Sequence, residues 1–309
     1  MKRFPTIHVW TILASSLLFL PQQTSACDLC GCASAGAQLG VLPQYNRSFV
    51  GLRYQFSSFQ HLKVDESLSN NGRVLNDAYQ TMEIWGRLML SEKDQLLLSL
   101  PYVVKTRNTE QTDLHTRGVG DLSVLYNRIL LQKDLLPWSI QWTAGGGLRL
   151  PTGKYRQRDP QQTMFPIGMQ VGTGAWAFPM FSQFGVRKNN WGLIAEAFVQ
   201  LHDENENNYR IGNYYQASLY FTHYKVMKKS MWMPILGLRQ EHSVGDREYG
   251  EIADHSGGSR FTALVGLDVY VGDWNAGFRG QIPVDQELNG VQPQWQGLWN
   301  AHLIYFFGK

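Results

Sequence analysis

The most constraining feature of this sequence is an alternation of apolar and polar residues that recurs along most of its length. The stretch 191–201, WGLIAEAFVQL, shows it well, because every odd position is apolar while Glu196 and Gln200 fall on the other face. Successive side chains of a strand point to opposite faces, so the pattern is typical of a β-strand with one apolar and one mixed face. A half-buried strand of a soluble protein looks the same, so the number of copies and their connections decide the fold.

Twelve stretches share this pattern, at 50–56, 81–87, 96–105, 121–127, 138–150, 175–186, 191–201, 215–222, 232–241, 261–271, 275–282 and 299–307. Their connections alternate between short ones (91–94, 131–137, 187–190, 227–230 and 272–273) and long ones (61–73, 107–118, 151–169, 202–209, 243–259 and 284–293). Outer-membrane barrels have an even number of strands, short periplasmic turns and longer extracellular loops, whereas a soluble sandwich has no reason to sort its loops in this way. The sequence therefore predicts an all-β fold, a transmembrane antiparallel up-and-down β-barrel of about 12 strands.

Composition excludes two other classes of protein. Beyond the extreme N-terminus no run of 18 apolar residues occurs in the 309-residue chain, which argues against membrane-spanning helices. The net charge of +3 is too small to suggest a nucleic-acid partner.

Tryptophans at the starts of expected strands are typical of the aromatic girdles at membrane interfaces, namely Trp138, Trp191, Trp232, Trp274 and Trp299.

The N-terminus has the features of a cleaved signal peptide. Lys2 and Arg3 precede an apolar segment at 9–20, and small residues at 24–26 form a cleavage site. We expect residues 1–26 to be the signal peptide, 27–46 a short periplasmic segment that carries the cysteines, and 47–309 the barrel. The expected location is the outer membrane of a Gram-negative cell, with outer-membrane lipid, the barrel-assembly machinery and a small solute as partners.

Three cysteines follow the cleavage site directly, at Cys27, Cys30 and Cys32. Their thiolates could bind a soft metal such as Cu(I) or Zn²⁺, although a complete zinc site would need a fourth ligand. Two of them could instead form a disulfide in the periplasm. Cys27 also stands where bacterial lipoproteins are cut and acylated, so lipidation is the third interpretation.

Ten charged residues lie on the faces expected to point inward: Arg53, Glu83, Arg87, Asp121, Arg149, Glu196, Arg239, Glu241, Asp268 and Arg279. Charges cannot face lipid cheaply, so these side chains are expected to line the lumen. Both signs are present, which favours pairing across the interior over selection of a charged solute. Glu83 and Arg87 share a strand face and are expected in one such network. The alternative is a hydrated path in which these charges tune which solutes pass.

No motif in the sequence indicates catalysis. The chain lacks a G-x-S-x-G elbow and an H-E-x-x-H pair, so we expect no enzymatic activity.

Three short motifs carry a resemblance to known barrels: GVGDL at 118–122, LPTG at 150–153 and GTG at 172–174. In order and spacing they resemble the outer-membrane family labelled phenol-degradation-pathway transporters, which implies a barrel related to channels for hydrophobic compounds. The start of the mature chain, CDLCGC followed by RSFVGLRYQF, is also similar to Bacteroidota outer-membrane barrels. Long-chain hydrocarbon channels carry a plug domain before the barrel, whereas here only about twenty residues precede the first strand.

Three functions follow as expectations. The first is an outer-membrane channel or transporter for small solutes, with hydrophobic compounds suggested by the resemblance. The second is a metal-handling protein that uses the cysteine cluster. The third is an interaction role for a barrel whose lumen is filled.

Overall fold

The computed structural model describes residues 47–63, 73–107, 114–158, 162, 164–290 and 292–308. The expected signal peptide and the segment 27–46 with Cys27, Cys30 and Cys32 lie outside the described residues. Within the described part of the chain, no helix has the length and apolar character needed to cross a bilayer.

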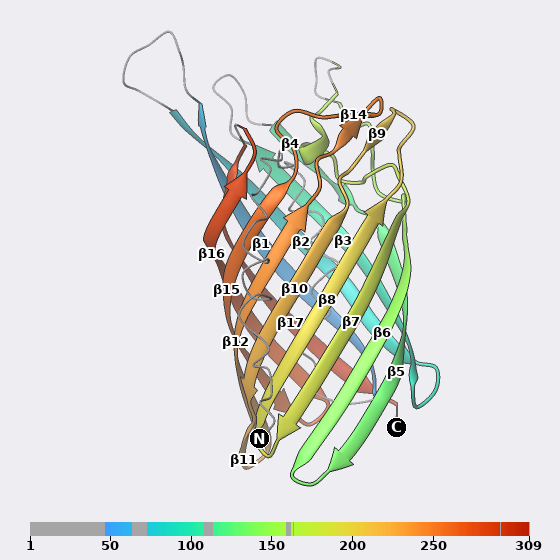
Figure 1. Cartoon of the computed structure of the whole chain (residues 1–309), viewed down its shortest axis with the longest axis vertical. Coiled ribbons are helices and arrows are strands. Elements are labelled where there is room, and N and C mark those ends of the chain that lie inside the picture. The colour runs from blue at the N-terminus through green and yellow to red at the C-terminus, as the bar shows by residue number, and fades with distance from the viewer. Residues whose placement is uncertain are drawn as a thin grey trace, which may run out of the picture.

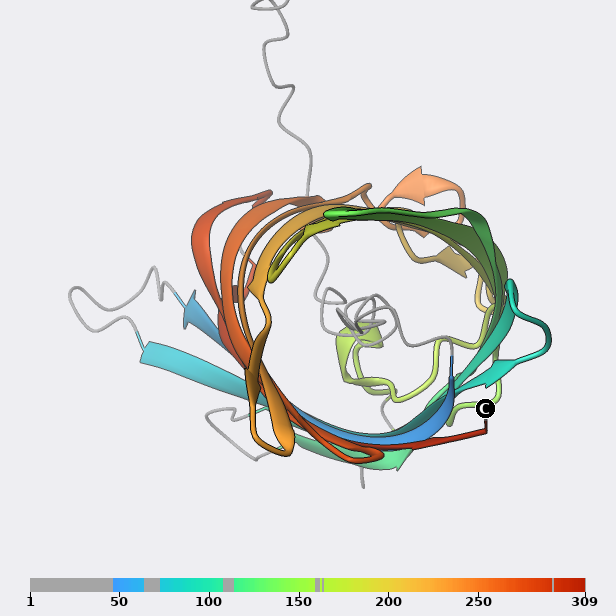
Figure 2. The same ribbon diagram turned by 90° about the horizontal axis from the view of Figure 1, so that it is seen from below.

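The chain forms a closed antiparallel barrel (Figures 1 and 2). Its sheet has 14 strands, of which the short β4 (Leu114–Val119) and β11 (Lys225–Met227) continue the lines of β5 and β10, so 12 strands form the ring. The ring strands are β1 (Ser48–Lys63), β2 (Arg73–Met89), β3 (Asp94–Arg107), β5 (Leu122–Leu135), β6 (Trp138–Leu150), β7 (Ala177–Lys188), β8 (Trp191–His202), β10 (Tyr214–His223), β12 (Ser230–Ser243), β15 (Gly258–Val271), β16 (Trp274–Leu288) and β17 (Gln294–Phe307). Each pairs with its neighbours in sequence, and β1 closes the ring by pairing with β17, with Ser48 opposite Phe307. The predicted twelve-stranded all-β barrel is confirmed.

The two faces of each strand differ as the alternation requires. In β8 the side chain of Leu193 is 47% exposed on the outside of the barrel, whereas Glu196 is 5% exposed on the inside. The same alternation places Ile84 and Val265 on the outer surface and Arg53 in the interior. A lipid-facing surface must be apolar and the backbone must be fully hydrogen-bonded, and this closed ladder satisfies both conditions.

The strands extend further than the alternation predicted, mainly on the side of the long loops. The expected loop 107–118 contains β4, which pairs with β3 beyond the end of β5. Pairing moves by one residue between the two, since Ser99 lies opposite Ser123 but Tyr102 lies opposite Val119. This β-bulge at residues 120–121 exchanges the inward and outward positions. The alternation of β5 therefore does not continue into β4, and the sequence pattern did not predict β4 as a strand. Outside the hydrocarbon layer the ladder can continue without an apolar face.

A second, small sheet lies beyond the barrel rim on the long-loop side (Figure 1). It is formed by β9 (Tyr209–Arg210), β13 (Arg247–Glu248) and β14 (Glu251–Ile252), which belong to two neighbouring loops. Two loops predicted to be irregular are thus joined into one structure.

Candidate functional site in the barrel lumen

The ten charged residues singled out from the sequence are all buried, with relative exposures of 0–8%. They come from seven of the ring strands and from the bulge before β5. In a barrel whose outer face is apolar, these positions form the polar interior. Their partners decide whether that interior is filled by ion pairs or left available to a solute.

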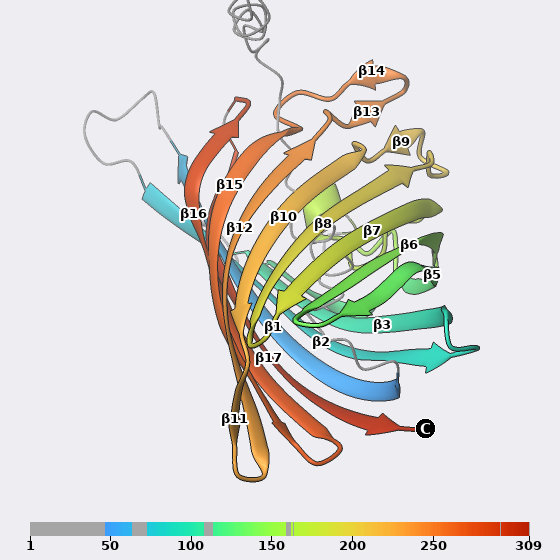
Figure 3. The same cartoon turned by 60° about the horizontal axis from the view of Figure 1, so that its bottom comes forward.

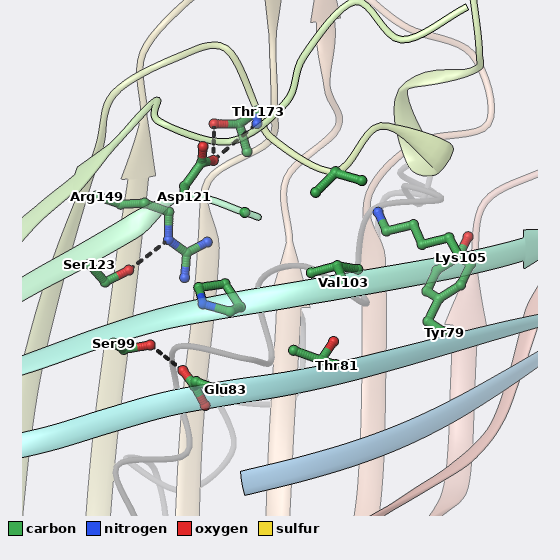
Figure 4. A pocket seen from close by; sticks show the side chains of 13 residues that line it. Tyr79, Thr81, Glu83, Ser99, Val103, Lys105, Asp121, Ser123, Arg149 and Thr173 are labelled. Atoms are coloured by element: carbon green, nitrogen blue, oxygen red, sulfur yellow. Dashed lines mark hydrogen bonds between the residues drawn. The ribbon is translucent and has the colours of Figure 1, made fainter. Parts of the chain in front are cut away.

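Two of the predicted residues on neighbouring strands pair directly. Arg53 of β1 lies opposite Glu83 of β2 in the ladder. Its Nε donates to Glu83 Oε2 at 2.7 Å and its Nη2 makes a second bond to the same oxygen. Ser99 of β3 donates to Glu83 Oε1 (Figure 4). Both carboxylate oxygens therefore have partners, as a buried carboxylate requires.

Arg87 was expected in one network with Glu83. In the structure its guanidinium donates to the main chain. Its Nε and Nη2 donate to the main-chain oxygen of Arg47 at 3.1 and 2.9 Å. The guanidinium also lies 5.1 Å from the ring centroid of Phe49. Arg87 therefore helps to hold the start of β1.

A second group of charges lies across β10, β12, β15 and β16. Arg279 Nη2 and Asp268 Oδ2 are 2.9 Å apart. Glu241 accepts from Tyr214 and lies 3.4 Å from Arg260. In this group each carboxylate therefore pairs with one arginine, Asp268 with Arg279 and Glu241 with Arg260.

Arg239 and Glu196 are held mainly by neutral groups. Arg239 donates to Ser218, Gln281 and Tyr220. Glu196 accepts from Gln183 and Gln216 on the adjacent strands. Gln216 and Ser218 thus link Glu196 to Arg239 through side-chain hydrogen bonds.

The three motifs shared with known barrels meet at Asp121. Its Oδ1 accepts from the backbone N of Gly153 at 2.9 Å. Its Oδ2 accepts from the backbone N of Thr173 at 3.0 Å and from Thr173 Oγ1 at 2.7 Å (Figure 4). One carboxylate therefore joins the GVGD bulge to both the LPTG and the GTG segments.

Glycine is required where these segments cross. A Cβ on Gly172 would lie 2.6 Å from the carbonyl carbon of Gly153, and one on Gly153 would lie 2.8 Å from the Cα of Gly172. The backbone N of Gly172 also donates to the oxygen of Lys154 at 2.7 Å. Two main chains can pass this closely only without side chains between them.

The described residues of the segment 151–176 (151–158, 162 and 164–176) turn into the barrel where these contacts hold them. Figure 2 shows its single short helical turn, η3 (Ile167–Met169), inside the ring of strands. Lys105 Nζ donates to the oxygens of Gly168 and Gln170, each at 2.8 Å. Thr116 Oγ1 donates to the oxygen of Met169 at 2.6 Å. These three successive carbonyls are thereby tied to the inner wall.

Apolar contacts complete this attachment. Met169 is fully buried against Phe59, Tyr79, Trp295 and Leu298, which belong to β1, β2 and β17. The segment is therefore a packed constriction of the lumen on the long-loop side.

The same segment has a contact with the next loop. Asn207 Nδ2 donates to the hydroxyl of Tyr155 at 2.8 Å, and Arg156 pairs with Glu206 at 2.8 Å. Partial burial raises the pKa of Tyr155, so the hydroxyl stays neutral.

A partly open hollow, about 550 Å³ with the open solvent at its mouth included, lies between the constriction and the wall formed by β2, β3, β5 and β6. Figure 4 shows Glu83, Ser99, Arg149 and Lys105 around it. A second cavity of about 390 Å³ shares Glu83, Ser99, Ser123 and Arg149 with the first and reaches Phe198 and Gln200. The two hollows follow one side of the interior, whereas the matched charge pairs Arg279–Asp268 and Arg260–Glu241 lie on other strands.

Some residues of this interior were not predicted as site residues. Lys105 is 1% exposed and Arg260 is 6% exposed. Lys105 stood on an inward face in the sequence pattern, so its position carried the signal. Arg260 lies one residue before the predicted strand start at 261, where the pattern gave no sign of the wall. Thr173 lies in the GTG motif at 172–174, but its hydrogen bonds to Asp121 join distant parts of the chain and no local pattern predicts them.

The proposed metal ligands cannot be placed, because the three cysteines lie outside the described residues. Among the residues that the structure describes, no group of three or more His, Cys, Asp or Glu side chains could hold a metal ion.

Comparison with known proteins supports the fold. No family model matches the chain. No curated protein matches it either. Among solved structures, the COG4313 outer membrane channel from Pseudomonas putida F1 superposes with a TM-score of 0.65 at 15% identity, over 87% of this chain and 100% of that one. The beta domain of the Bordetella autotransporter BrkA superposes with a TM-score of 0.51 at 12% identity, over 84% of this chain and 100% of that one. These likenesses, the apolar exterior and the closed ladder together identify the fold as a twelve-stranded outer-membrane β-barrel and support a location in the cell outer membrane.

Proposed function

We propose that this barrel is a passive outer-membrane channel for small solutes. The observation that carries the proposal is a pair of adjoining cavities along β2, β3, β5 and β6, which share four lining residues beneath a constriction built from the barrel's own loop. A barrel that served only as a rigid anchor would need no such hollow. The likeness to a solved outer-membrane channel agrees with this function.

The charges in the lumen suggest weak selection by charge. Arg53 and Glu83 neutralise each other, as do Arg279 and Asp268. Solute size at the segment 151–176 would then limit passage more than solute charge does.

A hydrophobic or amphipathic solute is the finer form of the proposal. Near the short-turn end the interior holds a packed apolar cluster contributed by β1, β2, β8, β10, β12, β15 and β17 and by Tyr224 after β10. These side chains are buried against one another at 0–9% exposure, so a solute that passes this end must move between apolar groups. Its buried members are Phe49, Trp85, Ile194, Tyr220, Tyr224, Met233, Ile235, Leu264, Tyr270, Ile304 and Phe306.

Solute flux into liposomes tests both the channel and its preference for hydrophobic solutes. The purified barrel is reconstituted, and swelling is followed in isosmotic arabinose, a pentose, and raffinose, a trisaccharide. We expect arabinose to enter faster than raffinose and faster than into empty liposomes. If both sugars entered no faster than they enter empty liposomes, the result would contradict the channel.

The hydrophobic arm uses two anions of equal charge. We expect sodium 2-naphthalenesulfonate to enter faster than sodium gluconate, and the variant Ile235→Asn to lose this preference while arabinose flux is kept. Equal flux of the two anions in the native barrel would contradict a hydrophobic solute without contradicting the channel.

A barrel silent to every solute would favour the filled-lumen interaction role. Thiol-dependent retention of Cu(I) or Zn²⁺ by the full chain would favour metal handling through Cys27, Cys30 and Cys32.

A further inference from the structure

The charged residues at the short-turn end of the barrel are unevenly distributed. Over most of this rim, four cations (Arg47, Lys93, Arg128 and Lys133) are matched by four carboxylates (Glu92, Asp94, Asp134 and Asp273). The turns between β7 and β8 and between β10 and β12 carry Lys188, Lys225, Lys228 and Lys229 and no carboxylate. We call these four lysines the basic arc. Figure 3 shows β11, which carries Lys225, at the short-turn end of the molecule.

The two parts of the rim also differ in pairing. Arg128 lies 3.0 Å from Asp94, and Arg47 lies 2.8 Å from Asp273. Of the basic arc, no lysine forms an ion pair with any carboxylate in the described part of the chain, and all four side chains are exposed. The arc is therefore a local excess of unneutralised positive charge.

Tryptophans lie next to lysines of the basic arc on neighbouring strands of the outer wall. Lys188 lies opposite Trp138 on one neighbouring strand and opposite Trp191 on the other. Its Nζ is 4.8 Å from the Trp138 ring centroid. Lys225 lies opposite Trp232. The three tryptophans are 39–50% exposed, so part of each side chain is open to the surroundings.

Apolar side chains continue from these rings along the barrel wall. Leu193, Phe221 and Leu236 follow on the outer faces of β8, β10 and β12, each 44–59% exposed. The wall thus offers, in order, free ammonium groups, amphipathic indoles and an apolar surface.

We propose that the basic arc, with the adjoining tryptophans, is a binding site for an anionic phospholipid of the inner leaflet. Short turns of such barrels face the periplasm, so the arc lies at the level of the phospholipid headgroups. The ammonium groups bind the phosphodiester, the indoles occupy the interface, and the acyl chains lie along the apolar wall. An acidic soluble protein would match the lysines but would have no use for the lipid-facing wall beneath them.

Native mass spectrometry of the purified full chain tests this site. The barrel is titrated with dioleoylphosphatidylglycerol and separately with dioleoylphosphatidylethanolamine, and the bound lipid is counted. We expect phosphatidylglycerol to be retained in preference to phosphatidylethanolamine, and retention to fall as ionic strength rises.

A matched pair of double variants locates the site. Lys225→Gln with Lys228→Gln removes two charges from the basic arc, and Lys93→Gln with Lys133→Gln removes two from the balanced part of the rim. We expect the first variant to weaken phosphatidylglycerol binding by about tenfold and the second to change it by less than about twofold. Heat-modifiable migration in gels confirms that both variants are folded.

Two outcomes would overturn the proposal. One is equal retention of the two lipids by the native barrel. The other is an equal loss in both double variants, which would show attraction by overall charge only.

Discussion

Arg53 and Glu83 show how the barrel interior accommodates buried charges, since the two side chains pair with each other. Each is almost completely buried, and each has hydrogen-bonding partners on a neighbouring strand. The alternation of the sequence predicted that both would point inward, because facing is a local property of a strand. Their pairing also follows from the register, which sets residue 53 opposite residue 83. The hydrogen bond from Ser99 depends on side-chain geometry that no pattern encodes.

The variant Glu83→Gln tests the importance of this pair. It leaves the Arg53 guanidinium buried without its carboxylate, so we expect the free energy of unfolding to fall by about 3 kcal/mol. Urea unfolding in liposomes, followed by tryptophan fluorescence, measures the change.

Asp273→Asn is the matched control, since it makes the same carboxylate-to-amide change in an exposed pair with Arg47. We expect a loss below about 1 kcal/mol there. Equal losses in the two variants would show that burial of the Arg53–Glu83 pair has no energetic consequence.

At the scale of the element, the segment 151–176 is the part that sequence reasoning could not place. Whether it folds inward depends on contacts of Asp121 with Gly153 and Thr173, residues up to 52 positions apart. The glycine motifs marked these places without revealing that they meet. The bulge at 120–121 was equally hidden, because it reverses the alternation on which the strand prediction rests.

Gly172→Ala tests whether the crossing of the two glycines holds this segment in the lumen. The added methyl would meet the Gly153 backbone, so the segment must move away from the wall. In a background with Met169→Cys and the native cysteines replaced by serine, we expect about tenfold faster labelling by a membrane-impermeant maleimide, because the fully buried position 169 becomes exposed.

Gly185→Ala provides the control for that experiment. A Cβ there would have its nearest neighbour, Cγ1 of Ile194, at 3.8 Å, an ordinary contact. We expect no change in labelling rate. A rate unchanged by Gly172→Ala as well would mean that the crossing does not fix the segment.

At the scale of the whole molecule, the barrel has an apolar outer face and an interior that is polar except for the apolar cluster near the short-turn end. The sequence predicted the difference between the two faces well, because both alternation and the sorting of connections by length are repeated around the ring. It did not predict the small sheet of β9, β13 and β14, whose strands of two residues are too short to show a period.

Val265→Arg tests the lipid-facing assignment. Val265 is 60% exposed on the outer face of β15, at the middle of the strand, so we expect the substitution to cost about 2–4 kcal/mol of unfolding free energy in liposomes. Ile252→Arg, at a position 65% exposed in β14 beyond the barrel rim, should cost less than about 0.5 kcal/mol. The same urea titration measures both, and equal costs would argue against a lipid environment at residue 265.

In the proposed channel, the interior is a solute path narrowed by the segment that Asp121 holds. Conductance in a planar lipid bilayer, native barrel against Asp121→Ala, tests it most directly. The variant removes three hydrogen bonds to Gly153 and Thr173 and leaves the ring of strands intact. We predict discrete openings in the native barrel and a conductance at least about twofold larger in the variant, because a wider path carries more ions. Silence in both proteins, or the same conductance in both, would contradict the account.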